Sequence, residues 1–117
     1  MCHVLIIEDE PLLALDLQDM LTTAGATSFA FAETEDEAVT EARVRRPDVI
    51  TSDVLLREGT GPRAVQTILG EIGPVPVIYI TASPEQCQPC APDASILAKP
   101  INEGIVSEAF RIVAPPR

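Results

Sequence analysis

The sequence of 117 residues has no tryptophan, one histidine and one lysine, and aromatic residues make up only 3% of it. Its longest unbroken apolar run is four residues, far short of the roughly 20 that a membrane-spanning helix needs. The N-terminus also lacks the basic and long apolar regions of a signal peptide. We therefore expect a soluble cytoplasmic protein, in which residues 1–117 form one domain with its own hydrophobic core.

Basic residues are scarce as well. Eight Lys and Arg residues stand against 18 Asp and Glu residues, which gives a formal net charge of −10. Nucleic-acid backbones are bound mainly by clustered basic side chains, whereas this chain offers only Lys99 and seven scattered arginines. We expect neither nucleic acid nor a membrane to be a direct partner.

Short apolar runs alternate along the chain with amphipathic stretches that are punctuated by Gly and Pro. Most of the runs are continuously apolar, which is typical of parallel strands covered by helices on both faces. Five strands are predicted at Val4–Ile7, Ser28–Ala32, Val49–Asp53, Val75–Thr81 and Ser95–Lys99.

Helices are predicted between these strands. The first ends at Gly25, the second begins at the capping box of Thr34 and Glu37 and ends before Pro47, and the third begins near Pro62. Apolar residues at helical spacing mark the first helix at Leu13, Leu17, Met20, Leu21 and Ala24, and the last at Ile105, Val106, Ala109, Phe110 and Val113. This alternation predicts an α/β fold, a doubly wound parallel sheet with helices on both faces.

Polar residues with reactive side chains follow or end four of these strands. Glu8 and Asp9 follow the first, Asp53 ends the third, Thr81 the fourth and Lys99 the fifth. The carboxyl ends of parallel strands meet at one edge of the sheet, where the functional sites of such folds lie. Carboxylates about 4 Å apart repel by roughly 4 kcal/mol at an effective dielectric near 20, so the cluster must bind protons or a cation. Oxygen donors without His or Cys suit Mg²⁺ or Mn²⁺.

Plainer interpretations exist for the same residues. Glu8, Asp9 and Glu10 could simply favour the N-terminus of a helix through its dipole, and we expect Glu10 to do no more than that. Thr81 could be an ordinary strand residue and Lys99 a solvated side chain, although the lysine stands at the end of an apolar run.

The chain resembles the receiver domain of two-component response regulators. The resemblance rests on four segments in this order and spacing: IIEDEP, SDVLLREGTG, ITASPE and LAKP. It covers essentially the whole chain, so residues 1–117 are expected to be one receiver domain. It implies a flavodoxin-like (βα)5 fold with strand order 2-1-3-4-5.

The resemblance also implies roles for individual residues. Asp53 matches the phosphoacceptor, Lys99 the ammonium that holds a phosphoryl oxygen, and Thr81 the hydroxyl that moves onto the phosphoryl group. The Lys99–Pro100 bond is expected to be cis. The implied Mg²⁺ ligands are Glu8, Asp9, Asp53 and the backbone carbonyl of Leu55.

A phosphorylation-dependent signalling switch is the function that this resemblance implies. It would take its phosphoryl group from a histidine kinase or a phosphotransfer protein, catalyse only its own phosphorylation and dephosphorylation, and signal by protein docking or relay. We expect a monomer or weak dimer, and the downstream partner is not indicated.

Two features depart from the family pattern. Ile96 occupies a position where a Tyr or Phe commonly takes part in switching, and Tyr79 is expected to fill the core instead. The 18 residues that separate Thr81 from Lys99 make this stretch about one helical turn shorter than expected, and its prolines leave room for only a short fourth helix. In having a shortened helix after ITASPE, the chain is also similar to the receiver domains of alphaproteobacterial general stress regulators.

Cys87 and Cys90 form a CxxC pair that is compatible with a redox pair, with part of a zinc site or with two small packing side chains. Zinc would need two further ligands, and a thioredoxin-type pair normally opens a helix after the first strand of its fold. Since the sequence offers neither context, we expect the two side chains to pack as small apolar groups.

Other protein classes fit the residues less well. A haloacid-dehalogenase-type phosphatase needs a second Asp two residues after the first, where this chain has Leu55. A flavodoxin binds a phosphate group after its first strand, where Glu8, Asp9 and Glu10 would repel it. A degenerate receiver that acts as an unphosphorylated interaction module remains the alternative, although Asp53 and Lys99 are both present.

Overall fold

The fold is a parallel β-sheet between two layers of helices, seen in a computed structural model that describes residues 1–87, 90 and 94–115. The five strands lie in the order β2-β1-β3-β4-β5, as the sequence predicted. Their bounds are β1 His3–Ile7, β2 Ser28–Ala32, β3 Val49–Ser52, β4 Val77–Thr81 and β5 Ser95–Ala98.

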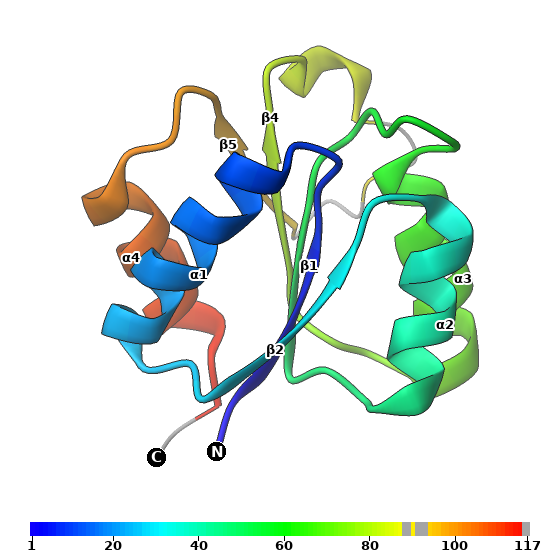
Figure 1. The fold of residues 1–117 in the computed structure, drawn as a ribbon, viewed down its shortest axis with the longest axis horizontal. Helices are drawn as coiled ribbons and strands as arrows, with labels where there is room; N and C mark the ends of the chain where they lie inside the picture. Colours follow the sequence, from blue (N-terminus) through cyan, green and yellow to red (C-terminus); the bar gives the residue numbers. More distant parts are fainter. Residues whose placement is uncertain (88–89, 91–93, 116–117) are drawn as a thin grey trace.

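The helices cover both faces of the sheet. Helices α1 (Pro11–Ala24) and α4 (Glu103–Val113) pack together on one face, and α2 (Glu35–Val44) and α3 (Gly61–Ile72) on the other (Figure 1). Each face has its own buried apolar cluster. The first centres on Leu17, Leu21 and Phe110, and the second on Ile50, Ile68 and Tyr79.

The strand register brings the carboxyl ends of the central strands to one edge. Ile7, the last residue of β1, lies opposite Ala32 of β2 and Ser52 of β3, and β1 is buried along its whole length. The chain order reverses between β1 and β3, which is where open α/β sheets bind their ligands. The loops after β1, β3 and β4 gather at this edge, at the top of Figure 1.

Local signals start and end the helices as predicted. The Thr34 side chain accepts a hydrogen bond from the Glu37 N–H at 3.2 Å and begins α2. Gly25 ends α1 with a φ of 121°, in the region that favours glycine.

Some predicted details were wrong. Four of the five strands differ from the predicted bounds by one or two residues at one end. The largest difference is in β4, which was predicted to begin at Val75 but begins at Val77, because Pro76 has no N–H for the strand ladder. Ile105 was predicted on the buried face of the last helix but is 55% exposed, whereas Val106 and Phe110 are buried.

The predicted short fourth helix is a single 3-10 turn in the described part of the segment between β4 and β5. This turn, η1, spans Pro84–Gln86. Residues 88–89 and 91–93 of the predicted segment lie outside the described residues. Among the residues that the structure describes, the next α-helix is α4, which follows β5.

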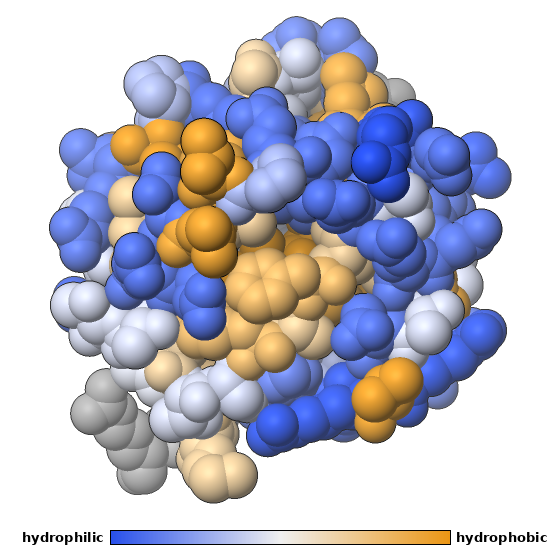
Figure 2. All heavy atoms as spheres, viewed as in Figure 1, coloured by the Kyte–Doolittle hydropathy of each residue, from blue (hydrophilic) through white to orange (hydrophobic). Residues whose placement is uncertain are grey.

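The surface carries several large apolar side chains. Figure 2 shows such side chains gathered near the middle of one face. Phe31 on the edge strand β2 is 42% exposed and stacks against Phe29 with ring centroids 6.4 Å apart. Among the described residues, no helix combines the length and apolar character that crossing a membrane requires.

Candidate functional site

One lysine contacts three acidic side chains at the carboxyl edge of the sheet. The Nζ atom of Lys99, directly after β5, lies 2.7 Å from Oδ2 of Asp53, 3.3 Å from Oε1 of Glu8 and 3.8 Å from Oε1 of Glu10. The Lys99 side chain is only 15% exposed, so these charges interact in a largely desolvated environment. The structure thus brings together residues that the sequence placed after three different strands.

Asp53 is held in place through its backbone and through both carboxylate oxygens. Its N–H donates to the carbonyl of Ile7 at 2.9 Å, which extends the ladder between β1 and β3 by one bond. Its Oδ1 accepts a hydrogen bond from the Val54 N–H at 2.6 Å, while Oδ2 contacts Lys99. The carboxylate is therefore buried and oriented, with 8% of the residue exposed.

Gly61 also shapes this edge, although it was not among the predicted site residues. A Cβ atom at Gly61 would overlap the carbonyl of Asp53 and Oγ of Ser52. The Gly61 N–H donates to the carbonyl of Val54 at 2.9 Å, which joins the start of α3 to the residues after β3. Gly61 stands in the segment EGTGP, so a glycine just before a helix proline was the available signal.

The acidic residues after β1 form a compact group. Oxygen atoms of Glu8, Asp9 and Glu10 lie within 4.8 Å of one another. The Glu8 carboxylate accepts a hydrogen bond from the Glu10 N–H at 3.2 Å. The Glu10 side chain does not cap α1, and its approach to Lys99 corrects the expectation that it only favours a helix N-terminus.

Burial changes the protonation of this group. Desolvation, followed by the negative charge of Asp53, raises the pKa of Glu8 from 4.5 to about 7, against the opposing effect of Lys99. Burial alone would lower the pKa of Lys99, but its hydrogen bond to Asp53 and the charge of Glu8 outweigh this and raise it. The site holds more negative charge than one lysine neutralises, and its exclusively oxygen donors fit a hard divalent cation.

Thr81 ends β4 beside this cluster and is almost fully buried. Its Oγ1 accepts a hydrogen bond from the Ser83 N–H at 3.0 Å, and its carbonyl accepts one from the Lys99 N–H at 2.9 Å. The Lys99–Pro100 peptide bond is cis, as expected. Tyr79 is 2% exposed, and burial raises its pKa to about 12, so the prediction that it fills the core is confirmed.

The loop between β3 and α3 is tied to α2. Leu55 pairs with Thr60 in an isolated antiparallel bridge, and the Leu55 side chain is 46% exposed. The Glu35 N–H donates to the carbonyl of Glu58 at 3.1 Å, and its Oε2 accepts from the Thr60 N–H at 3.4 Å. Glu35 is a second residue whose part in supporting this loop the sequence did not indicate.

Cys87 is buried in the apolar cluster and Cys90 packs against it, as expected, but the two cysteines form a disulfide and are not free thiols. The CxxC spacing by itself does not show whether the two sulfurs are bonded, whereas in the fold the two Cα atoms lie 5.6 Å apart, within reach of an S–S bond. Ile96, at the position where the family commonly has an aromatic residue, is 42% exposed. His3 lies at the opposite end of β1, where its Nδ1 hydrogen-bonds Oγ of Ser28 at 2.9 Å.

Comparison with known proteins identifies relatives of this architecture. The profile of the response regulator receiver domain family matches residues 4–110. The phyllosphere-induced regulator PhyR of Methylorubrum extorquens is 40% identical over 109 residues, which are 90% of this chain and 40% of that protein. The chain thus spans less than half the length of this curated relative.

Solved structures show the same fold. A mutant of the anti-anti-sigma factor PhyR from Bartonella quintana is 34% identical with a TM-score of 0.82, over 94% of this chain and 47% of that one. The receiver domain of a sensor histidine kinase from Pseudomonas aeruginosa is 24% identical with a TM-score of 0.83, over 96% of both chains. That domain was solved with a magnesium ion coordinated in its active-site cleft.

Replacing Gly61 by Ala is expected to lower the free energy of unfolding by about 1 to 3 kcal/mol, because the added methyl group overlaps backbone atoms of Asp53. Gly70→Ala is the matched control in the same helix. Gly70 has open space around it, so this change should stabilise by roughly 0.5 to 1 kcal/mol. Urea unfolding of the three proteins measures both effects, and equal stability of the two variants would contradict the proposed contact.

Replacing Glu8 by Gln is expected to stabilise the metal-free protein at high pH. Because the pKa of Glu8 is raised on folding from 4.5 to about 7, stability falls as pH rises between these values, and the cost of ionisation is fully present above about pH 7. Gln mimics the protonated acid, so the gain should be about 1 to 3 kcal/mol near pH 8 and small near pH 4.5.

Urea unfolding in EDTA at the two pH values measures this difference. Glu10→Gln is the control, because the Glu10 side chain is 66% exposed and its removal should change stability little at either pH. A gain for Glu8→Gln that is equal at both pH values would show that Glu8 ionises normally.

Proposed function

The chain belongs to the response regulator receiver domain family, and from this premise we propose that it is a switch that accepts a phosphoryl group on Asp53. Receiver domains are regulators in two-component signalling, and a histidine kinase or phosphotransfer protein is the phosphoryl donor that we propose here. The observation that carries the proposal is the Asp53 carboxylate, which is buried at the ligand-binding edge with its Oδ2 held 2.7 Å from Lys99.

The residues around Asp53 suit phosphoryl transfer. A carboxylate oxygen of Asp53 would form the new P–O bond while the P–N bond of a phosphohistidine breaks and the histidine nitrogen keeps the electron pair. Lys99 already contacts Oδ2 of Asp53. After transfer its ammonium would contact a phosphoryl oxygen instead, because the negative charge would then lie there. Phosphohistidine is a reactive donor, so Asp53 needs mainly a correct position, which its backbone and side-chain hydrogen bonds provide.

A divalent cation fits the acidic group beside Asp53. Mg²⁺ would be held by the side chains of Glu8, Asp9 and Asp53 and by the backbone carbonyl of Leu55. When bound, it supplies positive charge that offsets the carboxylates and the phosphoryl oxygens. Glu8, with its pKa raised to about 7, is the acid whose ionisation such charge would favour most.

Thr81 is the residue that we propose to report phosphorylation. Its hydroxyl now accepts a hydrogen bond from Ser83, and turning toward a phosphoryl group on Asp53 would break that bond. Tyr79 is buried in the core and Ile96 carries no ring, so the segment after Thr81 is the part expected to respond. We propose that this change is passed on by protein docking or by phosphoryl relay.

Asp53→Asn is expected to abolish phosphorylation, because an amide oxygen is a far weaker nucleophile than a carboxylate. With acetyl phosphate and Mg²⁺, wild type should take up one phosphoryl group, detected by intact mass and released by hydroxylamine. No uptake is expected when EDTA removes the Mg²⁺. Asp19→Asn, an exposed change on α1, should behave like wild type. Equal uptake by Asp53→Asn would disprove the assignment, and no uptake by wild type would favour the unphosphorylated interaction module.

Leu55→Asn is expected to shorten the lifetime of the phosphorylated state. Leu55 lies two residues after Asp53 in the sequence. Its side chain can neither orient water nor donate a hydrogen bond, whereas an Asn side chain can do both. Loss of phosphate over time measures the lifetime. Val44→Asn, at another exposed apolar position at the end of α2, is the control. An unchanged or longer lifetime for Leu55→Asn would count against this role.

A further inference from the structure

The Cys87–Cys90 disulfide lies in the segment between β4 and β5 and takes no part in the proposed phosphoryl chemistry. Cys87 directly follows η1, and its N–H donates to the carbonyl of Pro84 at 3.2 Å. Cys87 is 9% exposed, whereas Cys90 is half-buried and packs against the apolar cluster between the sheet and α3. One sulfur is thus shielded and the other is nearer to solvent.

A structural staple is a poor explanation for this bond. A disulfide stabilises a protein mainly by restricting the unfolded chain, and this effect grows with the number of residues in the closed loop. Here the two cysteines are only three positions apart. Besides Tyr79 and Cys87, the cluster contains 11 buried apolar residues, so the core on this side of the sheet does not depend on the bond.

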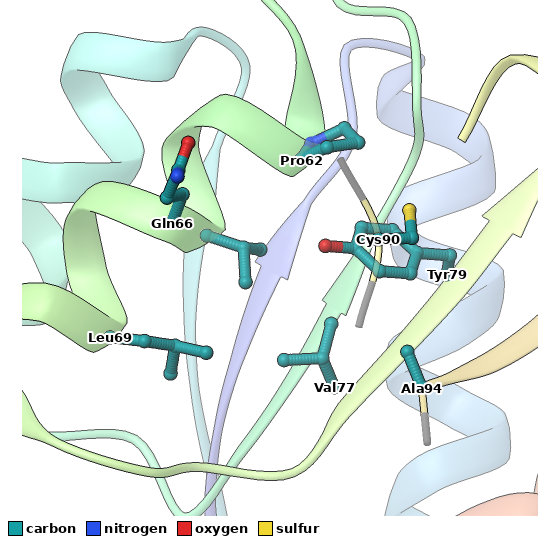
Figure 3. A pocket seen from close by; sticks show the side chains of 8 residues that line it. Pro62, Gln66, Leu69, Val77, Tyr79, Cys90 and Ala94 are labelled. Carbon is teal, nitrogen blue, oxygen red and sulfur yellow. The ribbon is translucent and has the colours of Figure 1, made fainter. Parts of the chain in front are cut away.

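The disulfide lies against the strand that carries Thr81. Cys90 and Tyr79 line the same apolar groove of about 320 Å³ beside α3, and Figure 3 shows the Cys90 side chain next to the Tyr79 ring. Tyr79 precedes Thr81 by two residues on β4. Ser83, whose N–H holds the Thr81 hydroxyl, immediately precedes η1, and η1 leads into Cys87.

We propose that Cys87 and Cys90 form a reversible redox modification site that controls how easily the segment after Thr81 moves. The disulfide holds this segment against Tyr79 and α3 and so favours the hydrogen bond between Ser83 and Thr81. Reduction breaks the S–S bond between Cys87 and Cys90, so that the segment after Thr81 can rearrange. The effect on signalling rests on the proposed function, because it acts on the hydroxyl that would turn toward a phosphorylated Asp53.

The chemistry requires a peroxide as oxidant and a dithiol as reductant. One thiolate attacks the peroxide O–O bond and becomes a sulfenic acid as water leaves; the second thiol then forms the S–S bond and releases another water. In reduction, a thiolate of the dithiol attacks the more accessible sulfur of Cys90 and Cys87 leaves as a thiolate. The second thiol of the reductant then releases Cys90, so the two electrons come from the dithiol.

Thiol counting tests the modification directly. The chain has three cysteines, and Cys2 is a free, buried thiol. After treatment with hydrogen peroxide or dithiothreitol, alkylation under denaturing conditions should modify one cysteine in the oxidised protein and three in the reduced protein. Cys2→Ala should keep the difference of two. Three modified cysteines under both conditions, or one under both, would overturn the proposal.

Tyrosine fluorescence gives a second readout that needs no phosphorylation. Tyr79 is the only tyrosine and the chain has no tryptophan, so the emission comes from the ring that lines the same groove as Cys90. Reduction of the native protein should change this emission reversibly, and the double variant Cys87→Ala/Cys90→Ala should show no change. Identical emission of oxidised and reduced wild type would show that the segment does not respond.

Beryllofluoride binding with Mg²⁺ tests the coupling to the site. Allosteric couplings commonly change affinity by about 5- to 150-fold, so the oxidised protein should bind beryllofluoride at least about fivefold more weakly than the reduced one. The double cysteine variant should bind equally under both conditions, and equal binding by both forms of wild type would refute the coupling. If neither form binds beryllofluoride, the proposed function and the coupling both fail. The thiol counts and the tyrosine emission then still decide whether Cys87 and Cys90 are oxidised and reduced reversibly.

Discussion

One ammonium group in contact with three carboxylates is the interaction on which the site depends. Lys99 reaches Asp53, Glu8 and Glu10 from the far side of β4, and the Lys99, Asp53 and Glu8 side chains are largely buried there. Removing such charges from water is costly unless they are paired, and one positive charge does not satisfy three negative ones. Burial, together with the negative charge of Asp53, raises the pKa of Glu8. The site is thereby prepared for more positive charge, and the proposed cation and phosphoryl chemistry follow from that need.

The two apolar clusters make the rest of the sheet edge rigid. β1 and β3 are buried along their whole length, and α3 begins so close to β3 that only glycine fits at position 61. Asp53 therefore stands on backbone that has little freedom to move. The segment after β4 is different, because a short 3-10 turn takes the place of a full helix in its described part. A buried, oriented acceptor beside a segment whose described part has no α-helix is an arrangement in which a local change of charge can become a change of surface.

The position of the disulfide connects two chemistries in that segment. Thr81 and Ser83 lie at its start, where the Thr81 carbonyl accepts a hydrogen bond from the Lys99 N–H, while Cys87 and Cys90 lie further along and pack in the apolar cluster beside α3. Both contacts act on the same few residues, so a change at either end alters the cost of movement at the other. The acidic pocket and the cysteine pair need no direct contact for this coupling.

Local patterns in the sequence determined the order of strands and helices and the residues that stand at the strand ends. Apolar runs, the Thr34 cap and Gly25 act within a few residues, and a parallel sheet then brings Asp53 and Lys99 to one edge. The tertiary structure alone decided other features: the approach of Glu10 to Lys99, the contact of Gly61 with Asp53 and the bond between Cys87 and Cys90. These depend on distances of a few ångströms between segments, which hydrophobic periodicity does not encode because it specifies which face of an element is buried and not which atoms meet there.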